Sequence, residues 1–92
     1  MEPAVDAFRD HLRSEKRASP HTVRAYLHDV GELSAFVQRL VGRAVALGDL
    51  DAIACRSYLA SLHGHNDAVT IGRKLSSLRA FFRFLVRRRM VA

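Results

Sequence analysis

The sequence has a single cysteine, Cys55, so no disulfide can form within the chain. Such sparing use of cysteine is typical of reducing compartments, and the expected location is the cytoplasm. No apolar run approaches the roughly 18 residues that a membrane-spanning helix needs. The opening MEPAVDAFRD is charged from its second residue and lacks the apolar stretch of a signal peptide. These absences predict an intracellular protein, or a piece of one, whose fold relies on its hydrophobic core.

Signatures of enzymes and metal sites are also missing. The five histidines form no metal-ligand spacing with Cys55, and the pair His63 and His65 lies in an expected turn. The sequence contains no glycine-rich phosphate loop and no nucleophile elbow. Tyr26 and Tyr58 fall within expected helices, where core packing or phosphate contact suits them better than nucleophilic attack. We therefore predict no catalytic residue, no metal and no cofactor.

The apolar residues that are present recur at helical spacing. Ninety-two residues with 49% hydrophobic content are enough for one small folded domain, spanning 1–92. No stretch alternates with the period of two that half-buried strands show. Four helical segments joined by short loops predict an all-α protein, folded as a compact four-helix bundle.

The first two helices have recognisable start and stop signals. A helix is expected from about residue 3 to 17, with acidic residues early and basic residues late. Ser19 followed by Pro20 predicts a helix N-cap and a proline at the first helical position. This second helix is expected to end at Gly42, which suits a C-terminal stop.

The other two helices follow a connector over 43–50. Asp51 is expected to cap the third helix, with Asp49 as the competing cap, and Gly64 lies near its end. Asp67 is expected to cap the fourth helix.

Each helix has an apolar stripe that predicts its buried face. The expected inward residues are Val5, Phe8 and Leu12, then Val23, Leu27, Val30, Leu33, Val37, Leu40 and Val41, then Ile53, Cys55, Leu59 and Leu62, then Ile71, Leu75, Leu78, Phe82 and Leu85. Phe81 and Phe84 fall outside the last stripe. Phe84 is interpreted as a contact for another domain, with packing on the second helix as the alternative.

The net charge of the chain comes almost entirely from the fourth helix. Residues 1–66 hold eight basic and eight acidic side chains, whereas 67–92 hold seven basic ones against Asp67 alone. A cationic helix on a balanced scaffold is typical of a surface that meets a polyanion. The alternative is a solvated helix face whose C-terminal arginines stabilise the helix dipole.

Polar side chains flank the apolar stripe of the fourth helix on both sides. Thr70, Arg73, Lys74 and Ser77 lie on one flank, and Ser76, Arg79, Arg83 and Arg87 lie on the other. Guanidinium groups grip phosphates, and short hydroxyl side chains let a nucleic-acid backbone approach closely. The pattern favours DNA over a merely solvated face.

Three segments resemble one known family. Residues 19–30, SPHTVRAYLHDV, resemble the "S-x-x-T-x-x-x-Y-x-x-D-l" signature of the N-terminal core-binding domain of tyrosine recombinases and phage integrases. Residues 70–85, TIGRKLSSLRAFFRFL, resemble the last helix of that domain, and residues 55–59, CRSYL, match its "i-R-x-y-L". The resemblance covers nearly the whole chain and is nearest to the Xer branch.

The resemblance implies a SAM-like four-helix bundle that forms half of a C-shaped clamp around double-stranded DNA. The second and fourth helices of such a domain cross the major groove of the recombination-site arm. Carried over by position, the residues expected to contact DNA are Thr22, Arg24, Tyr26, Arg73, Lys74, Ser77, Arg79 and Arg83.

The family also implies a parent protein that cuts and rejoins DNA, with chromosome dimer resolution as its expected role. Four protomers of the parent would form a tetrameric synaptic complex, in which the first helix would contact the neighbouring protomer. The catalytic residues of the family lie in a C-terminal domain that these 92 residues do not include. The expectation is therefore DNA binding without cutting. A small helical protein–protein adaptor with a basic docking helix is the alternative function.

Overall fold

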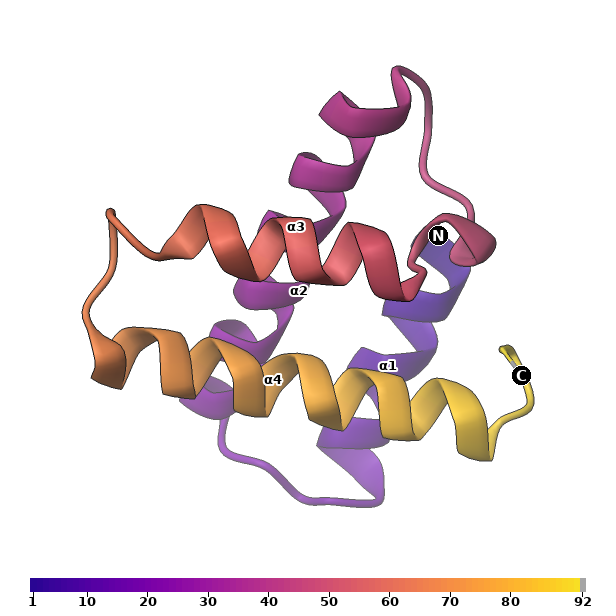
Figure 1. Ribbon diagram of the computed structural model, residues 1–92. Helices are drawn as coiled ribbons and strands as arrows, with labels where there is room; N and C mark the ends of the chain where they lie inside the picture. Colours follow the sequence, from indigo (N-terminus) through magenta and orange to yellow (C-terminus); the bar gives the residue numbers. More distant parts are fainter. Residues whose placement is uncertain (92) are drawn as a thin grey trace.

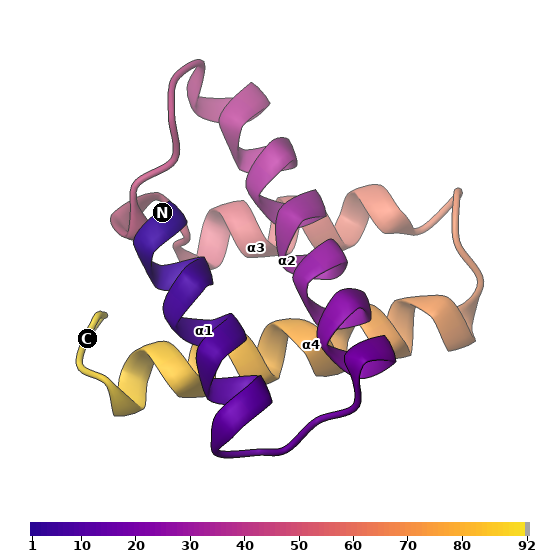
Figure 2. The same ribbon diagram turned by 180° about the vertical axis from the view of Figure 1, so that it is seen from behind.

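The helices form two crossed layers. The computed structural model describes residues 1–91 and contains α1 (Glu2–Ser14), α2 (Pro20–Val41), the short 3₁₀ turn η1 (Leu47–Asp49), α3 (Ala52–Leu62) and α4 (Ala68–Arg87). In Figure 1, α3 and α4 run side by side across the front, and Figure 2 shows α1 and α2 side by side behind them. The radius of gyration is 12.9 Å, close to the about 12 Å expected of a compact domain this long. The all-α four-helix prediction is confirmed.

The predicted helix caps are present. The side chains of Ser19, Asp51 and Asp67 each accept a hydrogen bond from the amide three residues later, at 3.1, 2.8 and 2.8 Å. Gly42 ends α2 in the left-handed conformation, with φ of 74°, a backbone region that favours glycine. Asp49, the competing cap, serves η1 instead and accepts the Ala46 amide at 2.8 Å.

The first helix is shorter than expected. It ends at Ser14, and the chain turns over the next residues, where Arg17 adopts a φ of 49°. The Ala18 amide then donates to the Leu12 carbonyl at 2.9 Å, which satisfies one of the last carbonyls of α1. The expected end at residue 17 is wrong because this turn is needed to reverse the chain into α2.

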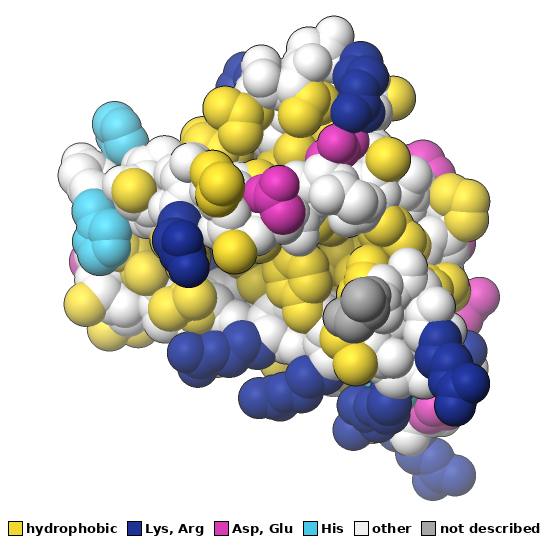
Figure 3. Space-filling view, turned by 45° about the vertical axis from the view of Figure 1, so that its right-hand side comes forward, with side chains coloured by type: hydrophobic (Ala, Val, Ile, Leu, Met, Phe, Trp, Pro, Cys, Tyr) yellow, Lys and Arg dark blue, Asp and Glu magenta, His cyan; other side chains and the backbone are white. Residues whose placement is uncertain are grey.

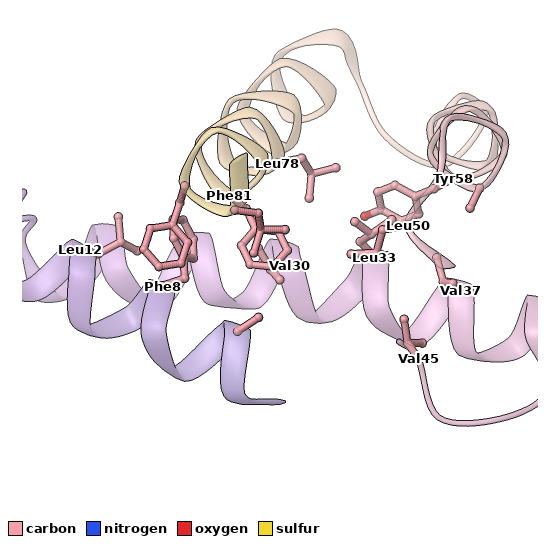
Figure 4. Close-up of a cluster of buried hydrophobic side chains, with 14 of the residues drawn as sticks. Phe8, Leu12, Val30, Leu33, Val37, Val45, Leu50, Tyr58, Leu78 and Phe81 are labelled. Carbon is pink, nitrogen blue, oxygen red and sulfur yellow. The ribbon is translucent and has the colours of Figure 1, made fainter. Parts of the chain in front are cut away.

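The hydrophobic core lies where α4 crosses the α1–α2 pair. Figure 4 shows Phe8, Val30 and Phe81 meeting there, with Leu33 further along α2 and Tyr58 of α3 close to it. The ring of Phe8 meets Phe81 edge to face at 5.2 Å and Phe84 at 5.5 Å. Such aromatic pairs add to the stabilisation that comes from buried area alone.

The buried face of α4 differs from the predicted one. Phe81 and Phe84 are 0% and 1% exposed, so the interpretation of Phe84 as a contact for another domain is wrong. Ile71, Leu75 and Phe82, expected in the buried stripe, are only half-buried. The buried face of α4 is rotated relative to the predicted stripe, because the polar residues described below share the interior side of the helix with Phe81 and Phe84.

Two further expectations about buried residues are wrong. Leu40 is 56% exposed and Ile53 is 71% exposed. The last turns of α2 extend past α3 in Figure 1, so Leu40 has little to pack against. On α3 the buried residues are Ala54, Tyr58 and Leu62, spaced by one turn, and this turns Ile53 outward.

Candidate nucleic-acid interface

A row of exposed arginines follows the outer side of α4. Arg79, Arg83 and Arg87 recur every four residues and are all exposed, so at 1.5 Å per residue they extend along one side of the helix for about 12 Å. Within residues 1–91, Arg79, Arg83 and Arg87 form no salt bridge. Figure 3 shows Lys and Arg side chains in a row along the lower edge of the molecule, where α4 lies. This row can contact a polyanion at several points.

A crevice lies beside the arginine row, where the start of α2 meets α4. Its volume is about 270 Å³, and its lining includes Thr22 and Tyr26 of α2, Arg83 and Arg87 of α4, and Lys16 from the turn after α1. Three of the predicted DNA-contact residues are thus brought together: Thr22, Tyr26 and Arg83.

The polar groups of this crevice suit an anion. Thr22 Oγ1 accepts a hydrogen bond from Ser19 Oγ at 3.0 Å, which leaves its own hydroxyl hydrogen free to donate. Three cationic side chains line the same space. Hydroxyl and charged donors around one small space match the chemistry of a phosphate group.

Arg24 lies apart from the crevice. It is exposed and lines a separate hollow of about 390 Å³ together with Arg13 and Pro20. The structure therefore places it near the same end of α2 but does not bring it together with Arg83.

Two predicted contact residues, Lys74 and Ser77, point into the protein. Ser77 Oγ donates to Asp29 Oδ2 at 2.6 Å, and the Lys74 ammonium pairs with Glu32 and lies 3.5 Å from Asp29 Oδ1. Burial alone would lower the pKa of Lys74, but the hydrogen bond and charge of Glu32, with the charge of Asp29, outweigh it and raise the pKa. Both side chains hold α4 against α2, and their burial removes them from the candidate interface.

Arg73 lies at the border between this buried network and the surface. Its side chain is 45% exposed, and its Nη1 donates to Asp29 Oδ2 at 2.5 Å. The guanidinium therefore reaches both a buried carboxylate and the solvent.

Several residues of this region were not singled out from the sequence. Asp29 entered only as a letter of the family signature, although it lies one turn from Tyr26 and Leu33 on an otherwise apolar face of α2. An acidic residue at that spacing signals a buried partner. Lys16 has no such signal, because only the chain reversal after α1 brings it to the crevice.

Within the described residues, no group of three or more His, Cys, Asp or Glu side chains could hold a metal ion. No helix among residues 1–91 has the length and apolarity needed to cross a membrane.

Comparison with known proteins identifies the family. Residues 5–89 match the family model described as "Phage integrase, N-terminal SAM-like domain". The tyrosine recombinase XerC of Pelobacter propionicus is 39% identical over 90 residues, which is 95% of this chain and 30% of that protein. The same-named protein of Lacticaseibacillus casei is 40% identical over 88 residues, covering 95% of this chain and 29% of that protein.

A third relative, the tyrosine recombinase XerC of Myxococcus xanthus, is 33% identical over 91 residues, 99% of this chain and 30% of its own length. The chain thus spans about 30% of the length of the curated relatives it matches. No solved structure matches it with significant similarity. The match to residues 5–89 confirms the resemblance seen in the sequence: the chain belongs to the phage integrase N-terminal SAM-like domain family, in the form found in Xer-type tyrosine recombinases.

Proposed function

We propose that this domain binds the double-stranded DNA of a recombination site through the first turns of α2 and the outer side of α4. The observation that carries the proposal is the crevice in which Thr22, Tyr26, Arg83 and Arg87 lie together beside the arginine row. Hydroxyl and guanidinium groups such as these donate hydrogen bonds to the phosphate oxygens of DNA.

The proposed contacts lie around the crevice and along α4, with Arg24 in the separate hollow at the start of α2. Of the contact residues expected from the sequence they include Thr22, Arg24, Tyr26, Arg73, Arg79 and Arg83, and the crevice adds Lys16 and Arg87. The groove of B-DNA admits a helix such as α4, so some of these arginines would also reach base edges.

The relatives suggest how this domain is used. They are named tyrosine recombinases and are about three times as long as the matched segment. The proposal is that a longer parent cuts and rejoins DNA with residues outside this domain, which itself binds DNA without cutting it. The parent would act in chromosome dimer resolution, with four protomers in the synaptic complex and α1 touching a neighbour.

The salt dependence of DNA binding tests the proposal. With roughly four to six phosphate contacts, the logarithm of the association constant should fall against the logarithm of salt concentration with a slope of about −4 to −5. Fluorescence anisotropy of a labelled duplex measures this. A slope near zero would contradict the proposal.

A matched pair of variants locates the interface. Arg83→Ala should weaken binding, whereas Arg39→Ala should not, because Arg39 is exposed near the opposite end of α2 from Thr22. Equal losses from the two variants would argue against the crevice as the contact surface.

Sequence preference separates DNA recognition from the adaptor function. A recombination domain should prefer a palindromic recombination-type duplex over a random duplex under the same salt conditions. A basic helix that docks an acidic protein would bind both duplexes alike, since only non-specific charge would attract them.

A further inference from the structure

Asp29 is a fully buried carboxylate with three donors around it. It lies in the middle of α2, and its side chain is 0% exposed. Ser77 Oγ and Arg73 Nη1 both donate to Oδ2, at 2.6 and 2.5 Å, and Lys74 Nζ lies 3.5 Å from Oδ1. All three donors come from α4, so the carboxylate joins the two helices proposed to face DNA.

The three donors differ in how far they reach the surface. Ser77 is fully buried and the Lys74 side chain is only 6% exposed, so their polar groups serve the interior alone. Arg73 is 45% exposed. Lys74 already supplies a buried countercharge, and Ser77 already supplies a short hydrogen bond. The guanidinium is therefore the one member of the network that can also serve a ligand outside.

Only one nitrogen of the Arg73 guanidinium is engaged within residues 1–91. Nη1 donates to Asp29, and the remaining N–H groups of the fork have no partner in the described chain. One edge of the guanidinium is thus fixed by a rigid, buried acceptor, while the rest is available to an acceptor in solvent. A long side chain held in this way loses less conformational entropy when it binds.

We propose that Asp29 is a positioning residue, which holds Arg73 in the conformation that meets DNA. This inference rests on the proposed function, because it assigns the ligand of Arg73 as a phosphate or base-edge acceptor of the duplex. The lone pairs of one buried carboxylate set the direction of the guanidinium before DNA arrives.

The Asp29→Asn variant tests this proposal, because the rival explanations predict different changes in DNA affinity. Removing a negative charge near the interface should strengthen DNA binding if only the field of the protein matters. A carboxylate that merely joins α2 to α4 should alter stability and leave the affinity of the folded protein unchanged. Positioning instead predicts weaker binding, by roughly 2- to 12-fold, the cost of ordering one long side chain.

A double-mutant cycle shows whether the effect passes through Arg73. The affinities are measured by anisotropy on the duplex that the wild-type chain binds best. Arg73→Ala should weaken binding by about fivefold or more, and Asp29→Asn should weaken it no further in that background. In an Arg79→Ala background, Asp29→Asn should keep its full effect. Val37→Ala, which truncates a buried residue at the other end of α2, should keep wild-type affinity.

A measurement on the wild-type chain covers the case in which Asp29→Asn does not fold. The guanidinium NMR signals of Arg73, assigned by their loss in Arg73→Lys, should show restricted rotation in the free protein. Those of Arg79, which forms no salt bridge within residues 1–91, should be averaged. An Arg73 guanidinium that rotates as freely as that of Arg79 would overturn the inference.

The outcomes also separate this inference from the proposed function. Suppose that the wild-type chain binds DNA and that Arg73→Ala weakens this binding. The positioning role is then wrong, and DNA binding stands, if Asp29→Asn strengthens DNA binding or leaves it unchanged. The same conclusion follows if Asp29→Asn weakens binding equally in the wild-type and Arg73→Ala backgrounds. If the wild-type chain shows no salt-dependent DNA binding, both fall.

Discussion

Phe84 of α4 packs against two residues of α1 and against the residue that caps its own helix. Its ring lies 5.5 Å from that of Phe8 and 4.9 Å from that of His11, and the Arg88 guanidinium lies 5.0 Å above it. These neighbours make it part of the α1–α4 contact, although its position on a helical wheel suggested an outward contact.

The Phe84→Ala variant should therefore lose stability. Removing a buried phenylalanine ring costs about 3–5 kcal/mol of the free energy of unfolding, which urea denaturation followed by circular dichroism measures. Phe82→Ala is the matched control on the same helix and should cost less, since Phe82 is only half-buried. Unchanged stability in Phe84→Ala would revive the idea that this residue serves another domain.

Tyr26 lines the proposed phosphate crevice and is half-buried. Tyr26→Phe should leave folding nearly intact and weaken DNA binding by about 0.5–1.5 kcal/mol, the net value of one ordinary hydrogen bond. Anisotropy with the labelled duplex gives the affinity. On a nicked suicide duplex, the wild-type chain should form no covalent adduct on a denaturing gel. An adduct that Tyr26→Phe abolishes would contradict binding without cutting.

At the scale of the helices, the start of α4 depends on an ionised cap. Asp67 accepts the amide hydrogen of Thr70 at 2.8 Å. This hydrogen bond, together with one from the Thr70 hydroxyl, lowers the pKa of Asp67 below its ordinary 3.8. Hydrogen bonds to the charged form favour that form, so the cap is strongest when Asp67 is ionised.

The acid dependence of stability should reflect this cap. Because the folded pKa lies below the unfolded one, the stabilisation is present above pH 3.8 and is lost as the pH falls through the folded value. Asp67→Asn keeps a capping oxygen without a charge, so it should lose less stability than wild type as the pH falls from above 3.8 through the folded pKa of Asp67. Urea midpoints across that range measure it.

Asp49 contributes to the same acid transition and makes a useful comparison. Its hydrogen bonds from the Arg43 guanidinium and the Ala46 amide also lower its pKa. Asp67→Asn should therefore retain part of the acid dependence, and identical curves for the variant and wild type would show that the α4 cap does not contribute.

At the scale of the whole molecule, the arginines of α4 and of the turn that follows it divide into two groups. Arg79 and Arg83 are exposed along the middle of the helix, whereas Arg88 donates to Glu15 Oε1 of the α1 end at 3.0 Å. Arg89 follows with a φ of 56°, in the turn that ends the helix. Position thus leaves Arg79 and Arg83 accessible on the surface, whereas Arg88 joins the end of the helix to the end of α1.

Alanine substitutions should separate these groups in DNA affinity. Arg73→Ala and Arg79→Ala should weaken binding more than Arg88→Ala and Arg89→Ala, and a base-edge contact by Arg73 would be worth about 1–3 kcal/mol. Affinities at one fixed salt concentration are the measurement. Four equal losses would indicate a diffuse cationic patch without defined contacts.

Local features of this protein could be predicted from the sequence because their causes are local. The caps Ser19, Asp51 and Asp67 each accept a hydrogen bond from an amide three residues away, so residues close together in the sequence determine them. The same holds for the stop at Gly42 and for the concentration of positive charge in α4. The family signature, read along the chain, identified the domain without any tertiary contact.

The rotation of α4 and the choice of which of its polar residues stay on the surface were decided only by tertiary structure. Lys74 and Ser77 looked like surface residues because hydrophobic periodicity treats every polar side chain as exposed. Their partner Asp29 lies 45 and 48 positions away, and burying a carboxylate requires such donors. This long-range pairing turned Lys74 and Ser77 inward, left Arg73 at the border, and placed Arg83 beside Thr22 and Tyr26.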